Sequence, residues 1–210
     1  AYEIRNCDWS SDVCSSDLGT TVAGNGASTQ PSIGGATGDV VAFTSLATNL
    51  ITAFSNANGA GADVYVHKIG TQVTTLLSHS VSSTSTSGKD HSEGPAVDAT
   101  GAVVAFESDA TNLLSGDTNS RRDVFYADVS GFSPFTRLRA SLTTTGVQAL
   151  GGGASKANVH KTGSRVRVAF QSDATNMASG SLPTTSAYLF DSAAGVSFLL
   201  NQISTTTTSA

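Results

Sequence analysis

Short apolar runs alternate with polar, glycine-containing segments along the chain. Two of the clearest are Val40–Phe43 and Val103–Phe106, which are rich in β-branched side chains and follow glycine turns. Runs of this length and composition predict buried β-strands. No 3.6-residue period is sustained, so no amphipathic helix is expected. No run of about 18 apolar residues predicts a membrane span.

The VAF run lies inside a longer segment that occurs three times. GDVVAFTSLATNL spans Gly38–Leu50, GAVVAFESDATNL spans Gly101–Leu113, and SRVRVAFQSDATNM spans Ser164–Met177. The shared phenylalanines, Phe43, Phe106 and Phe170, stand 63 and 64 residues apart. Self-similarity at a fixed period is the sequence signature of a repeat architecture. The chain from residue 19 onward is therefore predicted to hold three copies of one unit.

Each unit is predicted to form four short strands. The first is a stub before a Thr-Gly turn, where glycine tolerates backbone geometry that other residues resist. The second is the VAF run, and the third and fourth follow a polar loop. First strands are expected at Pro31–Ile33, Pro95–Asp98 and Ala157–His160, third strands at Asp63–His67, Asp123–Asp128 and Ala187–Asp191, and fourth strands at Thr74–Ser78, Thr136–Ser141 and Ser197–Asn201.

Four strands per repeat are typical of a β-propeller blade. A β-solenoid has much shorter coils, and an immunoglobulin-like sandwich needs about seven strands without such self-similarity. We therefore predict an all-β fold, a partial β-propeller of about three four-stranded antiparallel blades at residues 19–81, 82–145 and 146–210. A closed ring needs at least about four blades. The propeller is therefore expected to be not closed, and the chain to be an interior fragment of a larger one.

The pattern P-x-I…G-x-x-VAF-x-S-x-ATNL…D-V-(F/Y)-V…T-x-L-x-S resembles the TolB-like, WD-repeat-like β-propeller repeat of bacteria. The resemblance covers nearly all of residues 24–204 and is closest in the second copy. It is specific for the fold and implies no single function, because propellers host many activities. The first hairpin has Thr-Gly where the family has Asp-Gly. The third copy has Ala187 where an Asp is expected before the third strand.

The first eighteen residues differ from the repeats. AYEIRNCDWSSDVCSSDL holds both cysteines and the only tryptophan. It resembles a translated adapter of a short-read sequencing library: back-translated in one frame, AYE and DWSSDVCSSD match the fixed flanks, and Ile4–Cys7 covers the variable index. A native segment with a Cys7–Cys14 disulfide is the alternative. If the segment is an adapter artefact, residues 1–18 are not native and the true N-terminus is missing.

Composition narrows the function classes. Charged residues make up 13% of the chain, and the formal net charge of −5 becomes −2 over residues 19–210 (10 basic minus 12 acidic). The basic residues are few and scattered, so no nucleic-acid partner is predicted. Ser and Thr number 31 and 27, lysines are few, and residues 19–210 hold no cysteine. This composition favours a periplasmic or secreted location, which is also the usual setting of the resembling family.

Catalytic signatures are missing from the sequence, which has no GxSxG, HExxH or GxxxxGK[ST] motif. We therefore expect no enzyme activity and no cofactor. The expected function is that of a binding or scaffolding propeller with a protein partner or extracellular ligand. Two alternatives stay open: an accessory propeller domain of a larger hydrolase-type enzyme, and an architectural, adhesin-like surface repeat.

One weak candidate calcium site stands in SGDTNSRRD, where Asp117, Asn119 and Asp123 offer hard oxygen ligands. A calcium loop carries more acids, and the 12-residue pattern is not met. A solvated turn with Asx hydrogen bonds is therefore favoured. The compact cluster Asp90, His91 and Glu93 is likewise expected to be a solvated loop, because two neighbours in a flexible loop rarely converge on a metal.

The remaining polar and aromatic candidates are interpreted as structural. Recurring asparagines are expected to tie the following loop to backbone groups, and recurring phenylalanines to fill the core between blades. The histidines are expected at the surface or at strand ends, and a small basic spot on a solvated blade edge. These residues are Asn49, Asn112 and Asn176; Phe43, Phe106 and Phe170; His67, His79 and His160; and Arg121, Arg122, Arg137 and Arg139.

Overall fold

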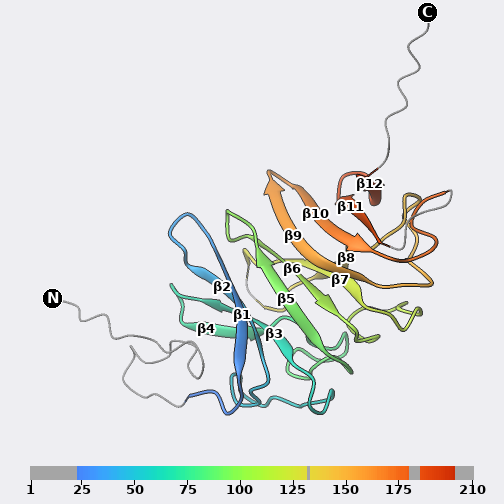
Figure 1. Ribbon diagram of the computed structural model, residues 1–210. Helices are drawn as coiled ribbons and strands as arrows, with labels where there is room; N and C mark the ends of the chain where they lie inside the picture. Colours follow the sequence, from blue (N-terminus) through green and yellow to red (C-terminus); the bar gives the residue numbers. More distant parts are fainter. Residues whose placement is uncertain (1–22, 132, 180–184, 202–210) are drawn as a thin grey trace, which may run out of the picture.

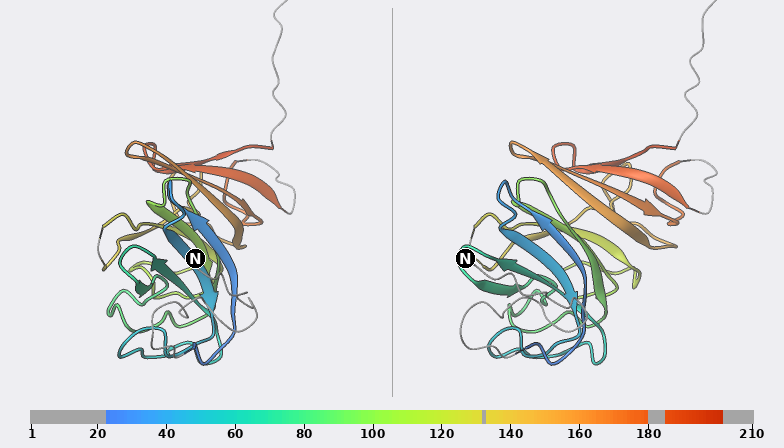
Figure 2. Two further views of the ribbon diagram at one scale, coloured as in Figure 1. Left: turned by 90° about the vertical axis from the view of Figure 1, so that its left-hand side faces the viewer. Right: turned by 60° about the vertical axis from the view of Figure 1, so that its left-hand side comes forward.

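The computed structural model describes residues 23–131, 133–179 and 185–201. In these ranges the chain forms twelve strands and no helix, arranged as three four-stranded antiparallel sheets. The sheets follow one another along the chain, and the middle sheet lies between the other two in an open arc (Figure 1; Figure 2). The predicted all-β, unclosed partial propeller is therefore confirmed. The adapter-like segment 1–18 lies outside the described residues.

Strands pair in sequence order, so every blade is a meander. Blade 1 comprises β1 (Ser28–Gly34), β2 (Val40–Ser45), β3 (Asp63–Lys68) and β4 (Val73–Leu76). Blade 2 comprises β5 (Ser92–Val97), β6 (Val103–Ser108), β7 (Asp123–Asp128) and β8 (Arg137–Arg139). Blade 3 comprises β9 (Ala154–Thr162), β10 (Arg165–Ser172), β11 (Ser186–Asp191) and β12 (Val196–Leu199). No helix in the described ranges is available to cross a membrane.

The first strands are longer than the predicted stubs, and β9 reaches nine residues. Backbone pairing with the VAF strand continues past the apolar residues, since ladder hydrogen bonds do not depend on apolar side chains. The register also corrects one alignment. Ser186, not Ala187, takes the position of Asp63 and Asp123, because each of these residues pairs with the last residue of the preceding strand.

Each first strand carries a β-bulge at the same place. Gln30, Gly94 and Lys156 adopt left-handed backbone conformations there, with φ of 52°, 62° and 58°. The bulged N–H groups are met by side chains of the preceding blade. Gly94 N donates to Gln30 Oε1 (3.0 Å), and Lys156 N donates to Glu107 Oε1 (2.6 Å). Because a bulge leaves backbone groups outside the ladder, this repeated feature links neighbouring blades.

The blades pack face to face, because successive side chains of a strand point to opposite sides of its sheet. We call the face that carries Phe106 in blade 2, and its equivalent in the other blades, the head face, and the opposite one the tail face. The blade 1–2 junction buries Val40, Ala42, Val64, Val66 and Leu77 against Val104, Phe106, Phe125 and Ala127. The blade 2–3 junction buries Val103, Ala105, Val124, Tyr126 and Ala140 against Val159, Val166, Val168, Phe170, Tyr188 and Phe190.

A strand latch of side chains holds the third and fourth strands of each blade together. Ser78 Oγ donates to Asp63 Oδ1 (2.9 Å) in blade 1, and Ser141 Oγ donates to Asp123 Oδ1 (2.5 Å) in blade 2. Blade 3 uses an uncharged pair, in which Asn201 Nδ2 donates to Ser186 Oγ (3.4 Å). In blade 3, both residues of the latch therefore differ from those in blades 1 and 2.

Candidate functional site

The three residues of the predicted calcium loop come together around an arginine. Carboxylate oxygens of Asp117 and Asp123 each lie 3.2 Å from the guanidinium of Arg139. Asn119 Nδ2 donates to Asp123 Oδ2 (3.3 Å), and the guanidinium lies 5.9 Å from the centre of the Phe125 ring. Because Arg139 supplies the positive charge that both carboxylates face, these residues do not fit a calcium ion.

The predicted solvated turn is wrong for these carboxylates, whose side chains are only 1% exposed. Burial raises the pKa of Asp123, and the charge of Arg139 and the Ser141 hydrogen bond oppose that rise. Gln148 Nε2 donates to Asp117 Oδ1 (2.8 Å). The two carboxylates are buried because the segment that leads to blade 3 contacts this loop through Gln148 and Ala149, a long-range contact that the local pattern does not encode.

The recurring asparagines form hydrogen bonds to backbone groups, as predicted, but with a different segment from the one expected. Each side-chain oxygen accepts a hydrogen bond from the segment that precedes the first strand of its own blade, not from the following loop. The donors are Asn25 N for Asn49 (2.8 Å), Lys89 N for Asn112 (2.8 Å) and Leu150 N for Asn176 (2.7 Å). In each blade, the ATN segment is therefore hydrogen-bonded to the segment that leads into the first strand.

The recurring phenylalanines lie in the core. Each ring stacks on an aromatic ring of the adjacent strand: Phe43 on Tyr65 (5.7 Å between ring centres), Phe106 on Phe125 (5.7 Å) and Phe170 on Tyr188 (5.8 Å). Phe106 and Phe170 belong to clusters that join two blades, whereas Phe43 packs with Tyr65 and Leu76 within blade 1.

The predicted surface position is wrong for His79, Arg137 and Arg139. The Arg139 side chain is only 10% exposed beside its two carboxylates. His79 and Arg137 are buried between blades 1 and 2. His79 Nδ1 donates to the carbonyl oxygen of Ser80 (2.7 Å), which leaves Nε2 to accept from the Arg137 guanidinium. Burial lowers the pKa of Arg137 to about 10. Burial and the Arg137 charge lower the pKa of His79 to about 4.

The other predicted polar residues lie apart from this pair. His67 Nδ1 lies 2.9 Å from Thr74 Oγ1 across β3 and β4. His160 and Arg121 are exposed. No group of three His, Cys, Asp or Glu residues in the described ranges is arranged to hold a metal ion.

His91 and Glu93, predicted to lie in a solvated loop with Asp90, instead join a partly buried charged group around Arg122 of blade 2. All three residues stand among the sequence candidates, but their association was not predicted. The Arg122 guanidinium lies 2.5 Å from Glu93 Oε1, 2.6 Å from Asp109 Oδ2 and 3.6 Å from Glu107 Oε2. His91 Nδ1 accepts from Ala62 N (3.0 Å), so in neutral His91 the proton is on Nε2, 3.4 Å from Glu93 Oε2. We call Arg122, Glu93, Glu107, Asp109 and His91 the rim cluster, because they lie where β5 begins, β6 ends and β7 begins.

The carboxylates of the rim cluster differ in environment. Burial acts to raise the pKa of Glu93, but its bonds to Arg122 and His91 outweigh burial and leave that pKa below its usual value. Burial raises the pKa of Glu107, although the backbone N–H groups of Ala157 and Lys156 oppose the rise. Three carboxyl groups of the rim cluster therefore surround one guanidinium.

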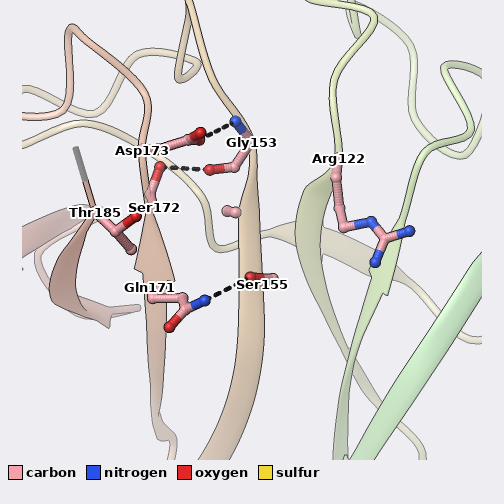
Figure 3. A pocket seen from close by; sticks show the side chains of 8 residues that line it. Arg122, Gly153, Ser155, Gln171, Ser172, Asp173 and Thr185 are labelled. Carbon is pink, nitrogen blue, oxygen red and sulfur yellow. Dashed lines mark hydrogen bonds between the residues drawn. The ribbon is translucent and has the colours of Figure 1, made fainter.

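Beside the rim cluster, an open depression of about 280 Å³ lies between blades 2 and 3 (Figure 3). Arg122 borders it from blade 2, and the facing wall is built from the first residues of β9 and the last residues of β10. That wall is held by hydrogen bonds from Ser172 Oγ to Gly153 O (2.7 Å) and from Gln171 Nε2 to Ser155 Oγ (3.2 Å). The lining is Arg122, Gly153, Ala154, Ser155, Gln171, Ser172, Asp173 and Thr185.

The rim cluster breaks the repeat symmetry of the blades. Strand registers place Ala62 and Thr185 where blade 2 has Arg122. The equivalents of Glu93 are Thr29 and Ser155. The groups around Arg137 and Arg139 also occur in one blade only, but they are buried, whereas the rim cluster keeps Glu93 and Asp109 partly exposed. The departure in blade 2 therefore marks this rim as the best candidate for contact with a ligand.

No protein-family model and no curated protein matches the sequence. Among solved structures, the chain is similar to a protein from Agrobacterium tumefaciens that carries the TolB designation, with a TM-score of 0.41 and 16% sequence identity. The alignment covers 79% of this chain and 62% of that protein, so the chain spans less than two thirds of its length. The fold assignment rests on the three sheets of the chain itself.

Proposed function

We propose that this chain is a non-catalytic binding and scaffolding propeller module that contacts a basic segment of a partner protein at the rim between blades 2 and 3. The observation that carries the proposal is the joint presence of the rim cluster and the open polar depression at one blade junction. The hydroxyl-rich composition supports placing this contact outside the cytoplasm.

The chemistry of the rim favours a cation. Glu93 and Asp109 keep about 30% of their side-chain surface exposed, so an incoming ammonium or guanidinium group reaches them without displacing the core. Asp173, on the far side of the depression, adds another carboxylate. Hydroxyl and amide groups of Ser155 and Gln171 offer neutral hydrogen-bond partners to a peptide backbone.

The test measures binding of fluorescent octalysine and octaglutamate peptides to the full chain by anisotropy. We expect octalysine to bind, with an affinity that falls as salt is added because exposed charges are screened. The double variant Glu93→Gln, Asp109→Asn is expected to weaken octalysine binding by roughly tenfold. The matched control is Asp128→Asn, an exposed acid at the opposite end of β7.

Thermal unfolding of both variants shows whether a change in binding follows from a change in folding. The proposal would be contradicted if the chain bound octaglutamate more tightly than octalysine. It would also be contradicted if the double variant and the control weakened octalysine binding equally. Absence of binding by either peptide at low salt would contradict it too.

A further inference from the structure

The tail face of blade 3 is uncovered at positions that are buried in the other blades. Leu200 N donates to Ala187 O (2.9 Å), as Leu77 N donates to Val64 O (2.8 Å) in blade 1, so the positions are equivalent. Leu77 and Val64 are fully buried against blade 2, whereas Leu200 is 52% exposed and Ala187 is also exposed. The tail face of blade 3 therefore exposes the surface that the next blade covers at the two internal junctions.

The head face of blade 1 lies at the other end of the arc (Figure 1). Phe43, Tyr65 and Leu76 on this face are already buried within blade 1, so the part open to a second copy is formed by Ile33 and Val41. Ile33 pairs with Val41 on this face, and the equivalent pair in blade 3 is Val159 with Val168. Val159 and Val168 are buried against blade 2. Ile33 is 64% exposed and Val41 is partly exposed.

Polar groups of the two end faces match in the same way. At the blade 2–3 junction, the Glu107 side chain accepts from the bulged Lys156 N–H. Gln171 stands in blade 3 where Glu107 stands in blade 2, since each follows the shared phenylalanine. Gln30 stands in the bulge of blade 1 where Lys156 stands in blade 3. A junction between the end faces therefore places the Gln171 side-chain oxygen opposite the Gln30 N–H.

We propose that the tail face of blade 3 binds the head face of blade 1 of a second copy of this chain, so that two copies close a ring of six blades. The apolar parts of both internal junctions are templates for this contact, and the blade 2–3 junction is the template for its polar part. Both halves of the contact are present on one molecule. Two copies form the contact twice, and six blades fall within the range of about four to eight in which propellers close. A head-to-tail contact that closes in this way forms a discrete ring, not a filament.

The test is the mass of the full chain in solution, measured by sedimentation velocity and light scattering over a range of concentrations. One copy has a mass of 21.2 kDa, and a mass of twice that value is expected. Ile33→Asp on the head face and Leu200→Asp on the tail face each place a carboxylate in the contact. Each is expected to raise the dissociation constant by roughly tenfold or more. Val147→Asp, at an equally exposed apolar loop position, is the matched control.

Mixing the two face variants gives a sharper result. The tail of the Ile33→Asp chain and the head of the Leu200→Asp chain are both unaltered, so the mixture is expected to form a one-to-one pair joined by that one intact contact. This pair is expected to be weaker than the wild-type pair, because its second contact carries both carboxylates. Neither variant alone has an intact contact. Circular dichroism of each variant checks that the strands are retained. A monomer at all concentrations, an open series of larger oligomers, or a pair that survives both substitutions would overturn the proposal.

Discussion

Protonation of His79 is expected to destabilise the fold between pH 7 and pH 4.5. In the folded chain its pKa is lowered from 6.5 to about 4, because the ring is buried and its Nε2 faces the Arg137 guanidinium. Between these two values the unfolded chain binds a proton that the folded chain does not, so stability falls as the pH falls. Each pKa unit is worth about 1.36 kcal/mol. The His79 contribution that is lost by pH 4.5 is therefore about 2 kcal/mol.

Asp63 acts in the opposite sense and has to be separated from His79. Burial raises the pKa of Asp63 from 3.8 to about 6, despite the Ser78 hydrogen bond that opposes the rise. Between these values the folded chain binds more protons than the unfolded one, so this group favours folding as the pH falls. His79→Gln removes only the imidazole titration, while its amide retains an acceptor for Arg137 and a donor for Ser80.

The assay is urea unfolding of the wild type and of His79→Gln, followed by circular dichroism at closely spaced pH values from 7.5 to 4.5. The free-energy difference between the two proteins is expected to shift by about 2 kcal/mol in favour of the glutamine variant as the pH falls. Comparison at each pH cancels Asp63 and the other shared groups. Parallel curves would refute the burial of a neutral imidazole beside Arg137, as would a direct titration of His79 by nuclear magnetic resonance near 6.5.

Three further predictions concern the core, the buried ion pairs and the bulges. Phe106→Ala is expected to cost about 3 to 5 kcal/mol in urea unfolding, because a fully buried ring stacked on Phe125 is removed at a blade junction; a loss below about 1 kcal/mol would contradict that packing. Arg139→Leu is expected to lower the free energy of unfolding by about 3 to 5 kcal/mol, since Asp117 and Asp123 then lack a counter-charge. Adding Asp117→Asn and Asp123→Asn to that variant should recover most of the loss. Addition of calcium is expected to leave the melting temperature of the wild type unchanged. Lys156→Gly is expected to stabilise the chain by about 0.5 kcal/mol in urea unfolding, because glycine adopts the left-handed backbone conformation without the strain that a side chain causes. Gly94 already occupies the equivalent position in blade 2. A loss of stability would show that the contacts of the lysine side chain outweigh this backbone strain.

The repeat unit and its strands were predictable because they depend on local patterns. The VAF runs, the Thr-Gly turns and the 63-residue period are each visible in a single stretch of sequence. Features that depend on main-chain pairing between strands were harder to predict from the sequence. The bulges at Gln30, Gly94 and Lys156 involve three unlike side chains that share only a backbone conformation.

The side-chain contacts between distant segments were not predictable from local patterns, whether they join two blades or two strands of one blade. Arg137 and His79 are separated by 58 residues, and Glu93 and Arg122 by 29. Nothing in the neighbourhood of either arginine indicates its partner. The calcium hypothesis for Asp117 and Asp123 failed for the same reason, because the cation that these acids face is a side chain on the fourth strand of the blade.

The strand latches bear on how such a gene can lengthen. Both partners of every latch lie within one repeat period, so a duplication of that length copies a working pair. The number of blades can then change by recombination, because each copied blade brings both residues of its own latch. The joint change to Ser186 and Asn201 in blade 3 is the pattern expected when a duplicated copy drifts under the constraint that its two members stay matched. Ala187 N still finds an acceptor in Asn201 (2.9 Å), as Val64 N does in Ser78 (3.0 Å), so the exchange leaves the backbone satisfied.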